Sequence, residues 1–74
     1  MDRFTDNLIM DLPASRIREL GAYILRFVEA MGSEIPVEGR LGNVDFCACA
    51  QSGGRVRVYW VQVGRRRISV GATI

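Results

Sequence analysis

The feature that most constrains the fold of this chain is the run 55–63, Arg-Val-Arg-Val-Tyr-Trp-Val-Gln-Val. Valine and aromatic residues favour β-strands, and the glycines on both sides of the run favour turns. The pattern therefore predicts a central strand between two turns. Because side chains alternate between the faces of a strand, we expect one set in a core, Val56, Val58 and Trp60, and the other set on the opposite face, Arg55, Arg57 and Tyr59.

Two neighbouring runs alternate in the same way, with apolar residues at even positions: 44–51 and 66–74. We expect three-residue loops between the strands, 52–54 and 64–66. These loops keep every even position on one face, with Phe46 and Val70 both opposite Trp60. Two-residue loops would mix core and solvent positions, so the alternation predicts the longer loops.

Residues 13–32 show the spacing of an amphipathic helix. Pro13 suits the first turn of a helix, and Gly32 suits its C-terminal end. Apolar residues recur at i, i+3, i+4 and i+7, which predicts one stripe on the helix: Ile17, Leu20, Ile24, Phe27, Val28 and Met31. For the N-terminal arm, 1–12, a helical turn and an edge strand both remain open. Residues 35–38 can add a short edge strand, since Pro36 excludes them from the middle of a sheet.

Together these elements predict one small α+β domain over residues 1–74. One amphipathic helix packs on a three-stranded antiparallel meander, in the order α-β-β-β. The hydrophobic fraction of 49% and the charged fraction of 24% are typical of a globular chain. Since a single helix covers only one face of the sheet, we expect the odd-numbered face to stay open to a partner.

The sequence also predicts the cellular environment. No apolar run approaches the ~20 residues of a membrane span, and the first residues lack the basic and apolar regions of a signal peptide. A strand would place Cys47 and Cys49 about 7 Å apart on one face. A disulfide across that distance would be strained, so we expect reduced thiols. We therefore predict a cytoplasmic protein with no membrane partner.

The composition argues against catalysis. The chain has no histidine and no lysine, so it offers no such base to activate a nucleophile. The acids Glu34, Glu38 and Asp45 are too scattered to act as a paired acid and base. Two cysteine thiolates are too few for a closed zinc site, which needs four ligands. We therefore expect a protein that is not an enzyme and that holds no metal and no cofactor.

Charge is divided unevenly along the chain. Residues 1–38 contain four arginines and seven acids, a balance of −3, whereas residues 39–74 contain six arginines and one acid, a balance of +5. Basic groups around an exposed aromatic ring are typical of sheets that bind RNA or single-stranded DNA. The candidate partner-binding residues are Arg55, Arg57, Tyr59, Arg65, Arg66 and Arg67. All ten basic residues are arginine, which coding bias also explains, so the meaning of the excess remains open.

The leading hypothesis is a non-enzymatic binding protein that acts by stoichiometric docking on a protein or ribonucleoprotein complex. Very small, motif-poor proteins of this kind often come from phages or mobile elements and inhibit a host defence complex, as anti-CRISPR proteins do. The alternative is a basic β-ribbon module that binds RNA or DNA directly. A further alternative is a homodimeric structural domain, joined through the N-terminal arm or through an interface on the odd-numbered face: Cys47, Cys49, Val61 and Val63.

Overall fold

The computed structural model describes residues 14–74, so the predicted arm 1–12 lies outside the described residues. One helix, α2 (Ala14–Met31), precedes four strands: β1 (Val37–Leu41), β2 (Val44–Gln51), β3 (Arg55–Val63) and β4 (Arg66–Thr73). A short 3-10 turn, Ser52–Gly54, joins β2 to β3. The predicted α+β class is therefore confirmed, but the sheet has four strands where the sequence predicted three.

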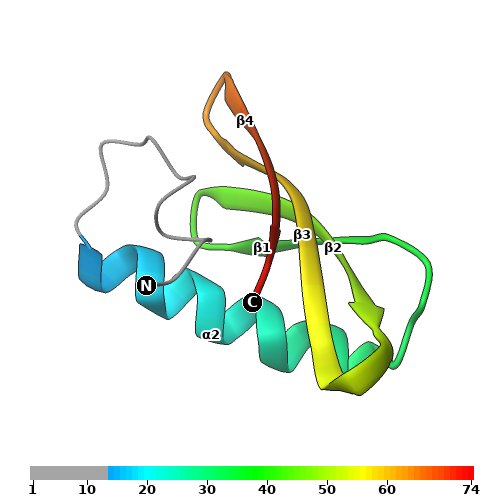
Figure 1. The fold of residues 1–74 in the computed structure, drawn as a ribbon. Coiled ribbons are helices and arrows are strands. Elements are labelled where there is room, and N and C mark those ends of the chain that lie inside the picture. Colours follow the sequence, from blue (N-terminus) through cyan, green and yellow to red (C-terminus); the bar gives the residue numbers. More distant parts are fainter. Residues whose placement is uncertain (1–13) are drawn as a thin grey trace.

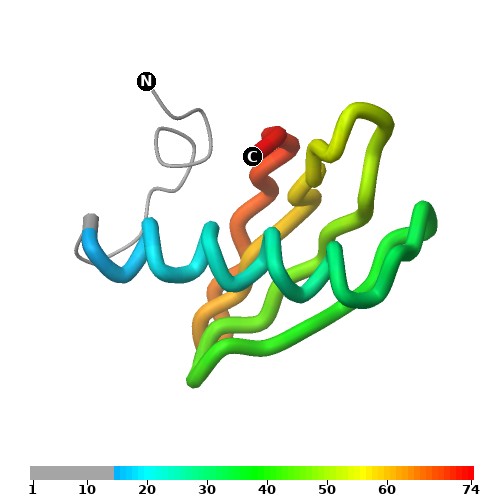
Figure 2. Tube along the Cα trace, turned by 90° about the horizontal axis from the view of Figure 1, so that it is seen from below, coloured from blue at the N-terminus to red at the C-terminus, as the bar shows by residue number. Residues whose placement is uncertain are grey.

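The strands form one antiparallel sheet in the order β1-β2-β3-β4, and α2 lies across one face of it (Figures 1 and 2). We call the face toward α2 the inner face and the opposite face the outer face. The additional strand is β1, which begins directly after Pro36 and pairs with β2 along its whole length. The predicted short edge strand at 35–38 is thus replaced by a longer strand further along the chain. Pro36, which has no N–H to donate, stays outside the ladder.

The core lies between α2 and the inner face. Four helix residues are buried at the expected spacing: Ile17, Leu20, Ile24 and Val28. They form one hydrophobic cluster with strand residues that are also buried: Val44, Phe46, Ala48, Val56, Val58, Val61, Val70 and Ala72. The predicted stripe is wrong at Met31, which is 57% exposed. Met31 is the last residue of α2, where the chain turns away at Gly32, so it does not reach the sheet.

An aromatic cluster joins the helix to the β1–β2 hairpin. The rings of Tyr23 and Phe27 on α2 both meet the ring of Phe46 on β2 edge-on, with centroids 6.0 Å and 5.4 Å away. Gly39 on β1 lies against the rings of Phe46 and Phe27: a Cβ atom built on it would lie 2.5 Å from Phe46 Cζ and 3.1 Å from Phe27 Cε1. A glycine inside a strand often marks such a close approach. Here it lets β1 lie against a large buried ring.

β3 contains a bulge at Tyr59. Ala48 pairs with Val58, and Phe46 pairs with Val61, so β3 takes three residue steps (61 − 58) where β2 takes two (48 − 46). The extra residue breaks the alternation of faces, as a β-bulge does. Val58 and Val61 therefore both point inward, although one has an even number and the other an odd number.

The bulge overturns the predicted orientation of the second half of β3. Trp60 was expected in the core, but it pairs with Cys47 and lies on the outer face. Val61 and Val63 were expected on the outer face. Val61 is 0% exposed in the core, and Val63 is partly buried against it. The physical reason is that the one-residue shift at Tyr59 exchanges the faces of every later residue in the strand.

The two hairpin loops differ from each other. Gln51 pairs with Arg55, so the three-residue loop between β2 and β3 is confirmed. Val63 pairs with Arg66, so the β3–β4 turn has two residues, and the predicted three-residue loop is wrong. Gly64 opens this turn with φ +59°, which suits a two-residue hairpin. Because the bulge has already moved Val61 and Val63 to the inner face, the shorter turn sets Val61 opposite Ile68 on that face.

Candidate functional site

The strand register arranges the outer face in rows across the sheet. The first row crosses all four strands: Arg40, Asp45, Gln62 and Arg67. The second row lies beside it: Glu38, Cys47, Trp60 and Ser69. A third row crosses three strands: Cys49, Arg57 and Thr73. Tyr59, the bulge residue, lies between the second and third rows, so the outer face presents two adjacent aromatic side chains.

Tyr59 is held by its neighbours on the outer face. Its hydroxyl lies 3.3 Å from Cys49 Sγ, and the Arg57 guanidinium carbon lies 5.9 Å from the centre of its ring. The hydrogen bond with Cys49 is the main reason that the pKa of Tyr59 is raised above its ordinary value. Cys49 is only 4% exposed, so its thiol supports Tyr59 from below and is not itself a contact group.

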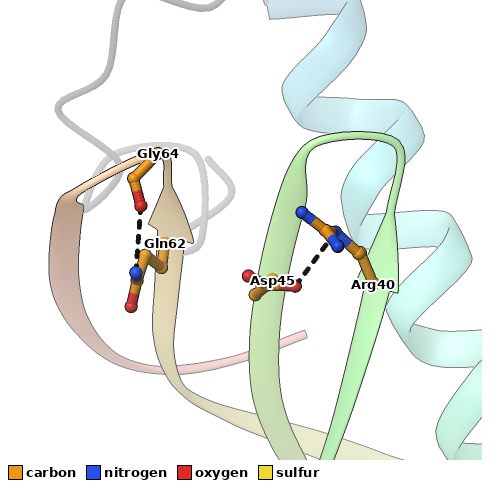
Figure 3. A network of polar contacts seen from close by, with 4 residues as sticks. All are labelled: Arg40, Asp45, Gln62 and Gly64. Carbon is orange, nitrogen blue, oxygen red and sulfur yellow. Dashed lines mark hydrogen bonds and ion pairs between the residues drawn. The ribbon is translucent and has the colours of Figure 1, made fainter.

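Trp60 is covered by an arginine. The Arg67 guanidinium carbon lies 3.9 Å from the centre of a Trp60 ring, a close cation–π contact. Arg67 Nε donates a hydrogen bond of 2.9 Å to Gln62 Oε1. Gln62 Nε2 in turn donates one of 3.0 Å to the Gly64 carbonyl (Figure 3). Arg67 is therefore anchored over the indole through a chain of contacts that begins at the β3–β4 turn.

Beside Trp60 the outer face is hollowed into a shallow depression of about 410 Å³. Its lining combines one aromatic ring with polar and charged groups from all four strands: Glu38, Gly39, Arg40, Asp45, Trp60, Gln62 and Arg67. Arg40 Nε and Asp45 Oδ1 form an ion pair of 3.3 Å at its rim (Figure 3). The depression has hydrogen-bond donors and acceptors around the Trp60 ring, and the Arg67 guanidinium lies over that ring.

The predicted partner-binding residues do not form one cluster. The register places Arg57, Tyr59 and Arg67 on the outer face. Arg55 begins β3 at the other end of the sheet, about 26 Å along the strand from Val63 by the usual rise per residue. Arg65 lies in the β3–β4 turn, whereas Arg66 pairs with inward-facing Val63 and so lies on the inner side of the hairpin end. The site therefore centres on β3 and β4, with Arg65 beside it.

The structure adds Trp60 and Gln62 to the candidate site, and it changes the role of the cysteines. Cys47 is half-buried next to Trp60, and burial, with smaller effects of the nearby Glu38 and Cys49, raises the pKa of its thiol. Since Cys49 is buried, Cys47 is the more accessible thiol on this face. The signal for Trp60 was present in the sequence: the valines of the run fall at 56 and 58, and then at 61 and 63.

The site combines an aromatic pair, arginines and a shallow depression, and these groups can stack against flat rings and pair with anions. Within residues 14–74, no helix has the length and apolar character needed to cross a membrane. No protein-family model, curated protein or solved structure matches this chain.

Proposed function

We propose that this protein is a non-enzymatic module that binds single-stranded RNA or DNA on its outer face. The supporting observation is the bulge in β3, which sets Tyr59 and Trp60 side by side on one face. Each ring has an arginine next to it, Arg57 beside Tyr59 and Arg67 beside Trp60. Sheets that bind single strands use this combination, because every nucleobase has a flat face that stacks on aromatic rings and guanidinium planes.

The two rings take different parts in this proposal. Tyr59 is fixed by the contact with Cys49, so its ring offers a rigid surface for one base. At Trp60 the guanidinium of Arg67 already occupies a stacking position. A second base either stacks on that guanidinium plane or takes its place on the indole. Arg65, in the adjoining turn, then lies where it can meet a phosphate of the same strand.

Intrinsic fluorescence gives a direct test, because Trp60 is the only tryptophan in the chain. Titration with a single-stranded oligonucleotide of about 10 residues, a length that suits a site of this class, is expected to quench its emission. The apparent affinity should fall steeply as salt is added, since arginines that meet phosphates release counterions. A duplex of the same sequence should bind less well, because its bases are already stacked. Unchanged emission and no mobility shift at low salt would reject the proposal.

Matched variants test the position of the site. Tyr59→Ala is expected to weaken binding by about 5- to 150-fold, the loss that one stacked base accounts for. Arg57→Gln should weaken binding, whereas Arg26→Gln should not, because Arg26 is exposed on α2 at the inner side of the sheet. Both arginine variants remove one positive charge. Equal losses in the two would indicate general charge attraction and would remove the outer face as the site.

A second candidate function is docking on a protein or ribonucleoprotein complex. It is favoured by the mixed charge of the depression, where Glu38 and Asp45 stand beside Arg40 and Arg67 around the Trp60 ring. Tryptophan, tyrosine and arginine are also the residues that dominate protein interfaces. The predicted stoichiometric inhibitor of a host defence complex belongs to this candidate. A partner that survives nuclease treatment in a pull-down, and that Tyr59→Ala loses, would favour docking over direct nucleic-acid binding.

A further inference from the structure

Among residues 14–74, β1 is an edge strand of the sheet. It pairs with β2 on one side, and no described segment lies beyond it on the other (Figure 2). Within residues 14–74, the backbone hydrogen bonds outside the helix and the strand ladders do not involve β1. An edge strand of this kind presents a row of unpaired N–H and C=O groups to any strand that approaches.

The sequence of β1 is complementary to itself in the antiparallel direction. Its residues read apolar, acidic, glycine, basic, apolar: Val37, Glu38, Gly39, Arg40 and Leu41. Pairing two copies about Gly39 sets Glu38 opposite the partner subunit's Arg40, and Arg40 opposite the partner subunit's Glu38. Opposite charges that face each other across two strands stabilise the pair. Val37 is likewise set opposite the partner subunit's Leu41, so two apolar side chains face each other on the inner side.

Other registers are disfavoured. A pairing centred on Glu38 in place of Gly39 sets the two Glu38 side chains opposite each other. A pairing centred on Arg40 does the same for the two Arg40 side chains. Like charges directly opposite are destabilising. A shift by one residue turns the outer face of one copy toward the side on which the other copy has its helix. One register alone therefore combines paired charges with helices on the same side.

The local packing also suits this register. Gly39 has no side chain, so the two backbones can approach at the centre of the pair without displacing the Phe46 ring beneath it. Val37 and Leu41 are only partly buried in the single chain, although both pack against the core. Pairing would cover their exposed parts, which adds apolar contact on the inner side.

We infer that two copies of this protein join through β1, antiparallel about Gly39, to form a symmetric dimer with one continuous sheet. Each Glu38 then faces the partner subunit's Arg40, so the two charge pairs are identical, as twofold symmetry requires. The outer faces of the two subunits then lie on one side of the extended sheet. This inference does not depend on the proposed function, since it rests on β1 and not on Tyr59 or Trp60.

The test is the molar mass in solution without any nucleic acid. Sedimentation equilibrium over a range of concentrations should show a reversible rise from 8.3 kDa toward twice that value. Arg40→Glu alone and Glu38→Arg alone should each stay at the single-chain mass, because each sets like charges opposite each other in the pair. An equal mixture of the two variants should again form dimers, since each acid then faces a base of the other variant. The double variant Glu38→Arg/Arg40→Glu should also dimerise.

Two controls keep the result decisive. Asp45→Asn removes the ion pair with Arg40 within the chain but leaves the β1 edge unchanged, so it should dimerise like the wild type. Far-ultraviolet circular dichroism should show that every variant is folded. A wild type that stays at 8.3 kDa at all concentrations would overturn the inference. So would single charge variants that dimerise normally, or a dimer that Tyr59→Ala abolishes, because that would place the interface on the outer face.

Discussion

Tyr59 and Trp60 are consecutive in β3, and both side chains lie on the outer face of the sheet. The Tyr59 hydroxyl is 3.3 Å from Cys49 Sγ, and the Arg67 guanidinium lies 3.9 Å from the centre of a Trp60 ring. In a regular strand two consecutive side chains point to opposite faces. The bulge removes that restriction, so β3 fills the core with valines and also presents two neighbouring aromatic rings.

Gly71 is expected to be required for the same irregularity on the β4 side. Between Val58 and Val61, β3 takes three steps, whereas β4 takes four between Ala72 and Ile68, and Gly71 in this stretch has φ +57°. Gly71→Val should lower the free energy of unfolding by about 1–2 kcal/mol, the cost of a left-handed conformation for an ordinary residue. A Cβ there would meet only Arg57 Nη2 at 3.9 Å, so the cost is conformational.

Gly71→Asn is the matched control for that prediction, because asparagine tolerates positive φ better than valine does. Urea denaturation of the two variants should therefore rank asparagine above valine in stability. If valine has no cost, β4 does not need the left-handed residue.

Gly39→Ala should destabilise the protein by overpacking. The added Cβ would lie 2.5 Å from Phe46 Cζ and 3.1 Å from Phe27 Cε1, and both rings belong to the aromatic cluster between α2 and β2. Overpacking of this kind costs about 1–3 kcal/mol. The measurement is urea denaturation of Gly39→Ala, Phe46→Leu and the double variant. The double variant should lose less than the sum of the two single changes, because leucine vacates the space; strict additivity would show that the ring is not the obstacle.

Removing Arg67 should uncover Trp60. Because the guanidinium lies 3.9 Å from the ring centre, Arg67→Ala is expected to increase quenching of the Trp60 emission by acrylamide. Loss of this cation–π contact should cost about 0.5–1 kcal/mol of stability. Arg66→Ala is the control, because Arg66 pairs with Val63 on the inner side of the hairpin end. Equal quenching in the two variants would contradict the stacked arrangement.

Stability should fall at alkaline pH through Cys47 and Tyr59. Burial is the main cause that raises the pKa of Cys47 above its ordinary value of 9.0, and the hydrogen bond with Cys49 raises the pKa of Tyr59 above 10.0. Both groups thus hold their protons more tightly when folded. Their contribution to stability is complete below the pKa values of the unfolded chain, and it is lost as pH rises through the folded values.

The measurement for this pH dependence is the urea midpoint at about pH 8 and about pH 11, which bracket the two ordinary pKa values. The midpoint should fall with pH, and it should fall less in the double variant Cys47→Ala/Tyr59→Phe, which lacks both titrating groups. An equal fall in the wild type and the double variant would assign the alkaline loss to other residues.

The sequence predicted the elements whose pattern is local. The period of the helix from Ile17 to Val28, the alternation of β2 and the three-residue loop after Gln51 are all present in the structure. β1 was predicted only in part, as a short edge strand at 35–38, because glycine and glutamate have low strand propensity. It is a strand because it pairs with β2 and because Gly39 fits against Phe46, and neither contact is visible in a local pattern.

The candidate site was also predicted only in part, because local alternation predicts some of its residues and strand pairing determines the others. Arg57, Tyr59 and Arg67 follow from alternation and lie on the outer face, as expected. Strict alternation across the whole of β3 predicts an inward Trp60, and the bulge at Tyr59 makes that prediction wrong. The change from even to odd valines at Val58 and Val61 marked the bulge, but a shift of parity also fits a loop or a strand end until the pairing with β2 is known.

The extra residue in β3 separates what the strand shows from what it buries. Without Tyr59, Val58 would be followed by Trp60 and Val61, and regular alternation alone would keep the tryptophan outward and the valine inward. In the pairing with β2, one residue therefore makes the difference between one aromatic side chain on the outer face and two. The order of the inward-facing side chains is unchanged. Insertion or loss of this one residue can thus change which side chains β3 exposes on the outer face while the same valines stay buried.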